Sequence, residues 1–327
     1  MNQAVAEELN MATDNGAAEA LGQLPGWAVP VIIGAAVLAI ALAIVLFVKR
    51  SRGKRKAGVT VPIPESGQSE QANDAIFSAK WLPVSSIGNV HGIGDREDQQ
   101  DAFGVSDLKN QSLVLGKGIL AIVADGMGGL HQSGAISHTL VQAGLAEFAG
   151  AEGSQREILL SLGAKINGMA IERFGRAATG TTFIAASIHR NQLDFLSIGD
   201  SRIALCRAGS LLTLNRVHNY AADLDSSAAR GLVSVASALN DPKRARLTSY
   251  VGMDDPKAVD LPVSPMTLQK GDRVLMMTDG LFGTLSDEEI VQALEMPAPE
   301  AAKRLDGLVR EKKKPNQDNY TAIILEI

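Results

Sequence analysis

The longest apolar run in the chain spans residues 27–48 (WAVPVIIGAAVLAIALAIVLFV) and contains no charged residue. A helix of this length would measure about 33 Å, close to the hydrocarbon thickness of a bilayer. We therefore predict one transmembrane helix over residues 27–48, preceded by a short extracytoplasmic tail at 1–26. Residues 49–80 show no apolar periodicity and are predicted to form a basic stop-transfer segment and a flexible linker. The pattern becomes that of a globular domain over 81–327.

Two kinds of hydrophobic pattern alternate in the globular part. Short apolar runs bounded by turn residues are typical of buried strands, and they occur at 119–124, 193–198, 274–277 and 320–325. Apolar residues at helical spacing predict helices over 133–148, 155–174 and 286–294. The last of these opens with a capping-box pattern of Ser286 and Glu289. Strand runs before and after a helical pair indicate an α+β fold in which helices cover a β-sandwich.

Charge is distributed very unevenly along the chain. Residues 1–48 contain four acids and no lysine or arginine, whereas residues 49–56 carry six basic residues. Because basic residues flank the cytoplasmic end of membrane helices, we expect a single-pass inner-membrane protein with its N-terminus outside and its globular domain in the cytoplasm. The net charge of −5 argues against a broadly basic nucleic-acid-binding protein. The single cysteine, Cys206, excludes an internal disulfide framework and cysteine-rich zinc sites.

Aspartates stand beside four apolar runs. Asp125, Asp200 and Asp279 each follow a run, and Asp318 precedes one. Any one of them alone is typical of a tight turn. Carboxylates gathered at one sheet edge would repel one another and raise each other's pKa unless a cation held them. Oxygen ligands without cysteine or paired histidine indicate magnesium or manganese rather than zinc.

Six short motifs occur in order through the domain: GDREDQQDAF (94–103), VADGMGG (123–129), GTT (180–182), GDSR (199–202), TDGL (278–281) and DN (318–319). In this order and spacing the sequence resembles the metal-dependent serine/threonine protein phosphatases, the type 2C-like or PPM family, in its bacterial form. The resemblance covers about residues 85–327. It implies an αββα fold, in which a central two-sheet sandwich is flanked by helices. It also implies two divalent ions, Mn²⁺ or Mg²⁺, held between the sheets.

The resemblance further implies a role for each residue that matches a motif. Arg96 would grip the substrate phosphate through a charge-assisted contact, and Asp101 would order the water that bridges the metal ions. The implied metal ligands are Asp101, Asp125, the Gly126 carbonyl, Asp279 and Asp318, with Asp200 helping to hold a third, weaker ion. A metal-bridging hydroxide would attack phosphorus in line and release serine or threonine without a covalent phosphoenzyme. The implied partners are phosphorylated proteins, in particular a bacterial Ser/Thr kinase or its substrates.

Two positions depart from the family pattern. Gln100 stands where many members have glutamate, and a neutral amide weakens one outer contact to the metal-bound waters. Met127 stands where eukaryotic-type members have a histidine that is the proposed general acid. The residue that protonates the leaving group is therefore left unassigned.

Residues 216–247 interrupt the rhythm of strands, and in the family this stretch forms a flap beside the active site, tied to substrate choice. The flap contains a basic cluster of Lys243, Arg244 and Arg246. One hypothesis is that this cluster steers phosphorylated segments toward the cleft. The alternative is that it is an ordinary solvated face.

Cysteine-based phosphatases, P-loop NTPases and the common zinc proteases are excluded, because the residues that they require are missing. Cys206 is not followed by an arginine at the spacing of cysteine-based phosphatases, and the chain contains neither a GxxxxGK[ST] loop nor an HExxH motif. Two alternatives of another class stay open. One is a metal-binding pseudophosphatase that serves as scaffold or sensor, favoured only by Gln100. The other is a membrane adaptor that acts through residues 1–26.

Overall fold

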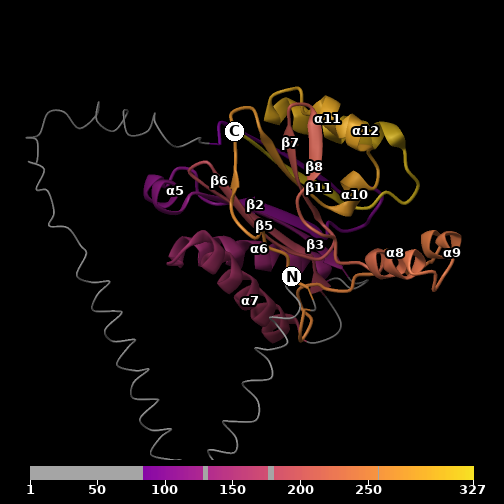
Figure 1. The fold of residues 1–327 in the computed structure, drawn as a ribbon. Coiled ribbons are helices and arrows are strands. Elements are labelled where there is room, and N and C mark those ends of the chain that lie inside the picture. Colours follow the sequence, from indigo (N-terminus) through magenta and orange to yellow (C-terminus); the bar gives the residue numbers. More distant parts are fainter. Residues whose placement is uncertain (1–83, 128–131, 176–179, 257) are drawn as a thin grey trace, which may run out of the picture. The chain divides into compact units, whose positions relative to one another are not determined.

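The computed structural model describes residues 84–127, 132–175, 180–256 and 258–327 (Figure 1). The predicted tail, membrane span and linker, residues 1–80, lie outside the described residues. None of the helices in the described ranges is both long enough and apolar enough to cross a membrane. The described ranges cover nearly all of the domain predicted over 81–327.

One sheet has five antiparallel strands in the order β1-β11-β10-β7-β8. Its strands are β1 (Ser86–Gly92), β7 (Arg202–Arg207), β8 (Ser210–Thr213), β10 (Arg273–Met277) and β11 (Tyr320–Glu326). Strand β11 lies between β1 and β10, so the first and last described strands pair along their whole length. Cys206 is buried on β7, as a small apolar residue would be.

The second sheet has six strands along the path β2-β3-β5-β6-β9, with β4 paired to the end of β3. Its strands are β2 (Asp101–Val105), β3 (Ile119–Met127), β4 (Gly180–Thr181), β5 (Phe183–His189), β6 (Gln192–Ile198) and β9 (Met266–Thr267). β3 and β5 are almost entirely buried, because one face is covered by helices and the other by the first sheet. Burial on both faces explains why such strands are continuous apolar runs in the sequence.

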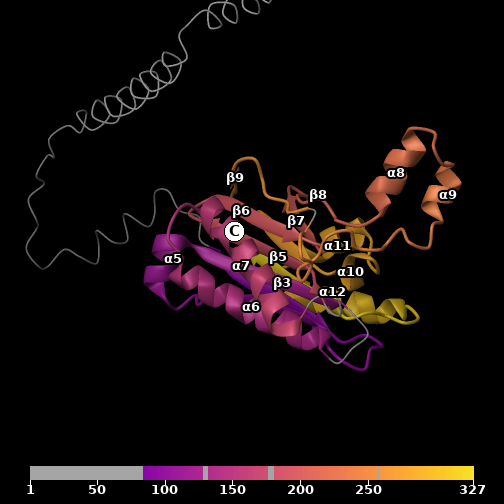
Figure 2. The same ribbon diagram turned by 90° about the horizontal axis from the view of Figure 1, so that it is seen from below.

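The sheets pack face to face, and each carries helices on its outer face (Figures 1 and 2). α6 (Ser133–Gly150) and α7 (Gln155–Phe174) cover the second sheet, while α11 (Asp287–Ala293) and α12 (Ala298–Lys312) cover the first. A short helix, α5 (Gln111–Lys117), links β2 to β3. One apolar core lies between the sheets and one lies under each helical layer. This arrangement confirms the predicted αββα sandwich.

Several predicted elements are found with nearly the predicted limits. The helix predicted over 155–174 is α7, and Ser154 caps it in a capping box with Glu157. The predicted Ser286 and Glu289 capping box opens α11. The four apolar runs all lie in strands, but β3 continues beyond its predicted end to Met127. Asp125 is therefore part of a strand rather than the residue that follows one.

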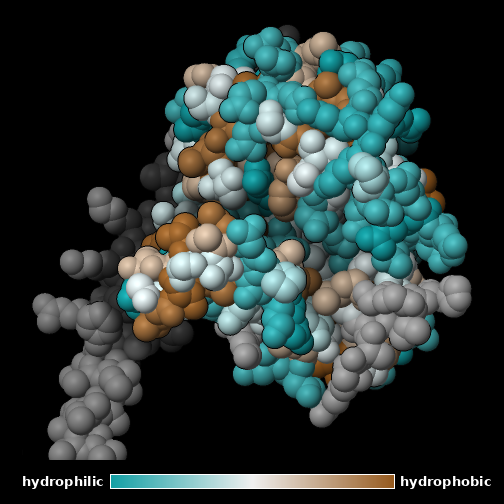
Figure 3. All heavy atoms as spheres, turned by 90° about the vertical axis from the view of Figure 1, so that its right-hand side faces the viewer, coloured by the Kyte–Doolittle hydropathy of each residue, from teal (hydrophilic) through white to brown (hydrophobic). Residues whose placement is uncertain are grey.

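Residues 216–247, the flap, leave the sandwich as a projecting hairpin of two short helices, α8 (Ala221–Ala229) and α9 (Val235–Leu239) (Figures 1 and 2). Its base is closed by main-chain hydrogen bonds from Tyr220 N to Arg246 O and from Thr248 N to His218 O, both 2.9 Å. Apolar side chains gather on the surface of the hairpin (Figure 3). The sequence prediction that this stretch leaves the strand rhythm is confirmed.

Candidate metal and phosphate site

Side-chain alternation along the strands directs two of the predicted acids into the gap between the sheets. Val123 of β3 lies in the core between the sheets, so Asp125, two residues later, faces the same gap. Phe103 of β2 packs against that core, so Asp101, two residues earlier, faces it too. Asp101 and Asp125 are directly opposite each other in the ladder. Like charges at opposite positions repel, so this register is unfavourable unless protons or a cation offset the repulsion.

Asp101 is held across the gap by two threonines of the other sheet. Its Oδ2 atom accepts hydrogen bonds from Thr278 Oγ1 at 2.9 Å and from Thr321 Oγ1 at 2.7 Å. The residue is only 4% exposed. Its Oδ1 atom is buried and has no hydrogen-bond partner among the described residues. Leaving a buried carboxylate oxygen without a hydrogen-bond partner costs free energy. Asp101 Oδ1 is therefore an acceptor that a cation or a water molecule could satisfy.

The GTT and GDSR motifs fix the main chain at Asp125. Asp125 N donates to Thr182 Oγ1 at 2.9 Å, and the Asp125 carbonyl accepts from Thr182 N at 2.9 Å and Thr181 Oγ1 at 2.8 Å. Thr182 Oγ1 in turn lies 2.7 Å from Ser201 Oγ, next to Asp200. Thr181 and Thr182 thus fix the main chain of Asp125 and connect it to the segment that carries Asp200.

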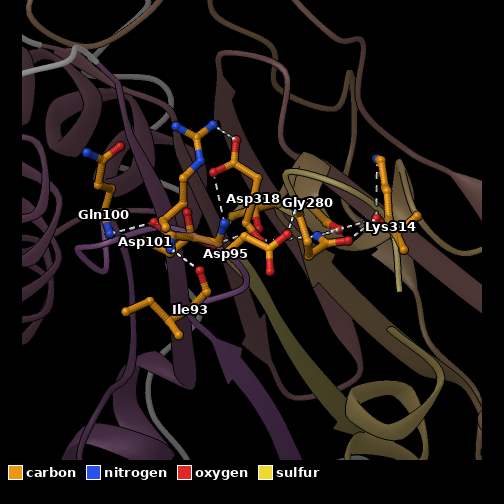
Figure 4. Close-up of polar contacts among 12 residues, drawn as sticks. Ile93, Asp95, Gln100, Asp101, Gly280, Lys314 and Asp318 are labelled. Carbon is orange, nitrogen blue, oxygen red and sulfur yellow. Dashed lines mark hydrogen bonds and ion pairs between the residues drawn. The ribbon is translucent and has the colours of Figure 1, made fainter. Parts of the chain in front are cut away.

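Gln100 joins three motifs through its main chain. Gln100 N donates to Asn319 Oδ1 at 2.8 Å (Figure 4), and the Gln100 carbonyl accepts from Gly126 N at 3.0 Å and from Ser137 Oγ at 2.6 Å. Gly126 sits so close to α6 that an added Cβ would lie 2.2 Å from the Ser133 carbonyl oxygen. Only glycine fits there, which keeps the Gly126 main chain next to the acids.

The remaining acids lie next to strands of the first sheet, and Asp200 is in the turn between β6 and β7. Asp279 opens the short helix α10 (Asp279–Phe282), and Asp318 precedes β11. The two segments pack tightly, because an added Cβ on Gly280 would lie 1.9 Å from the Asn319 carbonyl oxygen. Arg96 Nη2 donates to Asp318 Oδ2 at 2.7 Å, and both side chains are about half exposed. The predicted phosphate-binding arginine therefore contacts a predicted metal ligand (Figure 4).

Burial and mutual repulsion raise the pKa of four of these acids. Burial, followed by the charges of Asp279 and Asp318, raises the pKa of Asp101 to about 7, although the two threonine hydrogen bonds act in the opposite direction. Burial and the charge of Asp279 also raise the pKa of Asp200 to about 7. Burial and then Asp101 raise the pKa of Asp125 well above its usual value. Burial and then Asp318 raise the pKa of Asp279.

A cavity of about 410 Å³ brings the predicted residues to one surface, with Asp101 buried behind it. It is lined by Arg96, Gln100, Asp125, Gly126, Met127, Thr182, Asp200, Asp279, Asp318 and residues 245–247 of the flap. Of the predicted basic cluster, Arg246 lies at this cavity. Arg244 instead forms a two-pronged ion pair with Asp225 within the flap, at 2.7 and 2.9 Å. Arg246 therefore belongs to the site, whereas Arg244 has a structural role within the flap.

The donor chemistry of the cavity fits a divalent cation. All the predicted ligands offer oxygen, and the partnerless Oδ1 of Asp101 is a buried acceptor of the kind that magnesium and manganese bind. Within the described ranges, no three carboxylate, histidine or cysteine side chains converge closely enough to hold an ion. Asp318 is engaged by Arg96 instead. The fold thus brings the predicted ligands to one cavity, but their side chains are not close enough together to coordinate an ion as they stand.

We predict that Mn²⁺ stabilises the protein more at pH 7.5 than at pH 5.5. The raised pKa values of Asp101 and Asp200 give a stability contribution that is full below about pH 4 and lost as the pH rises to about 7, because the folded state binds more protons than the unfolded state over this range. A bound cation offsets the repulsion that then appears. Melting temperatures measured in Mn²⁺ and in EDTA should diverge as the pH rises.

A matched pair of variants tests the source of this divergence. Asp200→Asn removes one titrating acid and should reduce it. Asp107→Asn should leave it unchanged, since Asp107 is exposed and its side chain accepts a turn hydrogen bond from Lys109 N, which asparagine can also accept. Parallel curves for the wild type from pH 5.5 to 7.5 would contradict the prediction.

Three residues that shape the site carry little signal in the sequence. Thr278 precedes Asp279 in the TDGL motif, but its contact with Asp101 depends on how the sheets pack. Thr321 looks like an ordinary strand residue. Lys314 belongs to a basic stretch at the end of α12, yet its charge lowers the pKa of Asp279. Sequence motifs identify the acids, whereas the roles of Thr278, Thr321 and Lys314 depend on the tertiary structure.

Comparison with known proteins points to one family. The family model "Protein phosphatase 2C" matches residues 90–317. The serine/threonine protein phosphatase PstP of Mycobacterium tuberculosis is 29% identical over 238 residues, which are 68% of this chain and 43% of PstP. The chain thus spans less than half the length of that relative.

Solved structures agree with the family model. The serine/threonine phosphatase of S. agalactiae superposes with a TM-score of 0.64 at 25% identity, over 74% of this chain and 99% of that one. The catalytic domain of PstP in complex with two manganese ions superposes with a TM-score of 0.54 at 25% identity, over 73% and 96% of the two chains. The family model, the shared fold and the motif residues around one cavity agree: the chain belongs to the protein phosphatase 2C family.

Proposed function

We propose that the protein is a metal-dependent phosphatase that hydrolyses phosphoserine and phosphothreonine in proteins with two Mn²⁺ or Mg²⁺ ions. The observation that carries this proposal is the cavity in which acids from both sheets meet, with Arg96 on its lining and a partnerless carboxylate oxygen behind it. The family membership and the manganese-bound relative support it.

Each acid has a distinct place in the proposed mechanism. Asp125, the Gly126 carbonyl, Asp279 and Asp318 would hold the two ions, and Asp200 would help to hold a third, weaker one. When bound, divalent ions lower the pKa of water and neutralise charge on the phosphoryl oxygens. Asp101, fixed by Thr278 and Thr321, would orient the attacking water through its second oxygen.

Arg96 would bind the phosphate of the substrate. Its guanidinium lines the cavity, and its present partner, Asp318, is a proposed ion ligand. An incoming phosphate and a cation at Asp318 would each replace one half of this ion pair, so the two binding events would favour each other. The exchange retains a charge-assisted contact for both side chains.

Phosphate release from a phosphothreonine peptide by the full chain tests the function. We expect turnover with Mn²⁺ or Mg²⁺ and none in EDTA. Asp279→Asn should lose activity, whereas the exposed control Asp107→Asn should retain it. Folded, manganese-binding protein that released nothing from several phosphopeptides would exclude the enzyme and leave the pseudophosphatase, the class that Gln100 favours.

We also propose that a helix over residues 27–48 anchors the chain in the inner membrane, with the domain in the cytoplasm, and that its substrates are a Ser/Thr kinase or that kinase's substrates. The support is the uncharged apolar run and the six basic residues that follow it. Tethering raises the local concentration of the domain near membrane phosphoproteins. Equal partition of the full chain and a chain lacking residues 27–48 into the membrane fraction would contradict the anchor.

A further inference from the structure

A second cavity, of about 510 Å³, lies beside the first. Its wall includes the apolar side chains of Ile93, Val309 and Tyr320, and its basic residues are Arg310, Lys313 and Lys314 at the end of α12. Asp95 and Gln317, which also line it, are the sequence neighbours of Arg96 and Asp318. The two cavities are thus separated by the loops that carry the proposed phosphate-binding and metal-binding residues.

The charge in this second cavity is mostly positive and only partly compensated. Lys314 Nζ donates to the Gly283 carbonyl at 3.0 Å and lies 3.4 Å from Thr284 Oγ1, which are both neutral partners. No carboxylate in the described ranges lies within ion-pair distance of Lys313 or Lys314. Arg310 pairs with Asp306, yet its side chain is 71% exposed. The one lining acid, Asp95, accepts a hydrogen bond from Gln317 N at 3.0 Å.

Lys314 connects this basic cavity to the acids of the first one. It holds the Gly283 carbonyl, which directly follows α10, the helix that begins at Asp279. In Figure 4, Lys314 lies beyond Gly280 on the side away from Gln100. A ligand bound at the lysines would therefore lie close to a phosphate bound at Arg96.

We infer that the second cavity is a subsite for another anionic side chain of the substrate, either a second phosphorylated residue or an aspartate or glutamate near the phosphorylated one. The inference rests on the proposed phosphatase function and names the substrates that the site prefers. The Arg310 guanidinium and the ammonium groups of Lys313 and Lys314 attract an anion, and the apolar wall packs against the carbon atoms that carry it. Arg96 and the ions would bind the phosphate that is cleaved, and the three basic residues of the second cavity would bind the anionic group that is not cleaved.

The test compares phosphothreonine peptides that differ at one position. A phosphothreonine, an aspartate or an alanine is placed at successive positions on either side of the phosphothreonine to be cleaved, and kcat and KM are measured with Mn²⁺. We expect KM to be about fivefold lower at the matching position, with kcat unchanged, because a solvent-accessible ion pair contributes about 1 kcal/mol at most. Comparing phosphate with aspartate shows whether the subsite selects dianionic or carboxylate groups; a preference for either one over alanine supports the inference.

Two variants remove charge from the subsite without touching the first cavity. Lys313 has a left-handed backbone (φ +48°), so Lys313→Asn is chosen because asparagine tolerates that conformation. Arg310→Gln retains a good helix former. The double variant should lose the preference for the second anion and keep its activity on the alanine peptide. Lys303→Gln, on an exposed position of α12 that does not line the cavity, should change neither.

The possible outcomes distinguish failure of the anion subsite from failure of the proposed phosphatase function. Equal KM for anionic and alanine peptides in the wild type, or a preference that survives in the double variant, would overturn the subsite while leaving the phosphatase in place. Failure to hydrolyse any peptide would reject the phosphatase itself, and the subsite with it.

Discussion

Asp125→Asn should reduce phosphatase turnover by at least about 1,000-fold and, at the same time, raise the melting temperature of the metal-free protein. The loss of turnover is expected because electrostatic stabilisation by bound ions supplies several kcal/mol to phosphoryl transfer. The gain in stability follows from burial and from the charge of Asp101, which together raise the pKa of Asp125 well above its usual value. Asparagine fills the same space without the charge.

The size of the stability effect depends on pH. As the pH rises and the carboxyl group is forced toward its charged form, we expect the variant to melt above the wild type in EDTA by a margin that grows to roughly 2–4 °C, the shift that about 1 kcal/mol produces in a domain of this size. As the pH falls and the wild-type carboxyl group becomes protonated, the difference should shrink. In Mn²⁺ the order should reverse, since only the wild type binds the ions fully. A variant less stable than the wild type in EDTA at pH 8 would show that the carboxylate is stabilising on its own.

Gly280→Ala should destabilise the protein by about 3 kcal/mol, at the upper end of the cost of overpacking a core. The added Cβ would lie 1.9 Å from the Asn319 carbonyl oxygen, which is main chain and cannot rotate away. To relieve this contact, α10 and the start of β11 must move apart, and they carry Asp279 and Asp318. We therefore expect weaker metal binding in the variant even at temperatures where it is folded.

Gly307→Ala provides the matched control. Gly307 lies within α12, and the nearest atom to an added Cβ is Glu311 Oε1 at 4.0 Å. Alanine there should stabilise the helix by about 0.5–1 kcal/mol. Urea denaturation and manganese titration of both variants would measure the two effects. A Gly280→Ala protein with wild-type stability and manganese affinity would mean that the α10–β11 contact is looser than the structure shows.

The elements that could be predicted from sequence are those with a local cause. α7 and α11 each begin with a capping box, so the position where each helix starts is determined by residues close together in the sequence. The continuous apolar runs of β3 and β11 reflect burial on both faces. Asp125 and Asp279 each precede a glycine in a family motif, so both could be predicted as site residues from the sequence alone.

What could not be predicted depends on contacts between distant segments. Thr321 bonds to Asp101 across 220 positions, and nothing near Thr321 in sequence marks it as a site residue. Arg96 was expected to face a phosphate, and its contact with Asp318 arises because two loops from opposite ends of the domain meet. Likewise, the division of Arg244 from Arg246 depends on how the flap folds back on itself.

The position of β11 has a consequence for the order in which the protein is made. This strand leaves the ribosome after the other described strands, yet it lies inside its sheet, between β1 and β10, and Asp318 and Thr321 come with it. Until it emerges, β1 has no neighbour in its sheet, Asp101 lacks one of its two threonines, and the ion site lacks an acid. A nascent chain with ten of the eleven described strands therefore has an incomplete ion site, and it exposes strand edges that can pair with other chains until β11 is added.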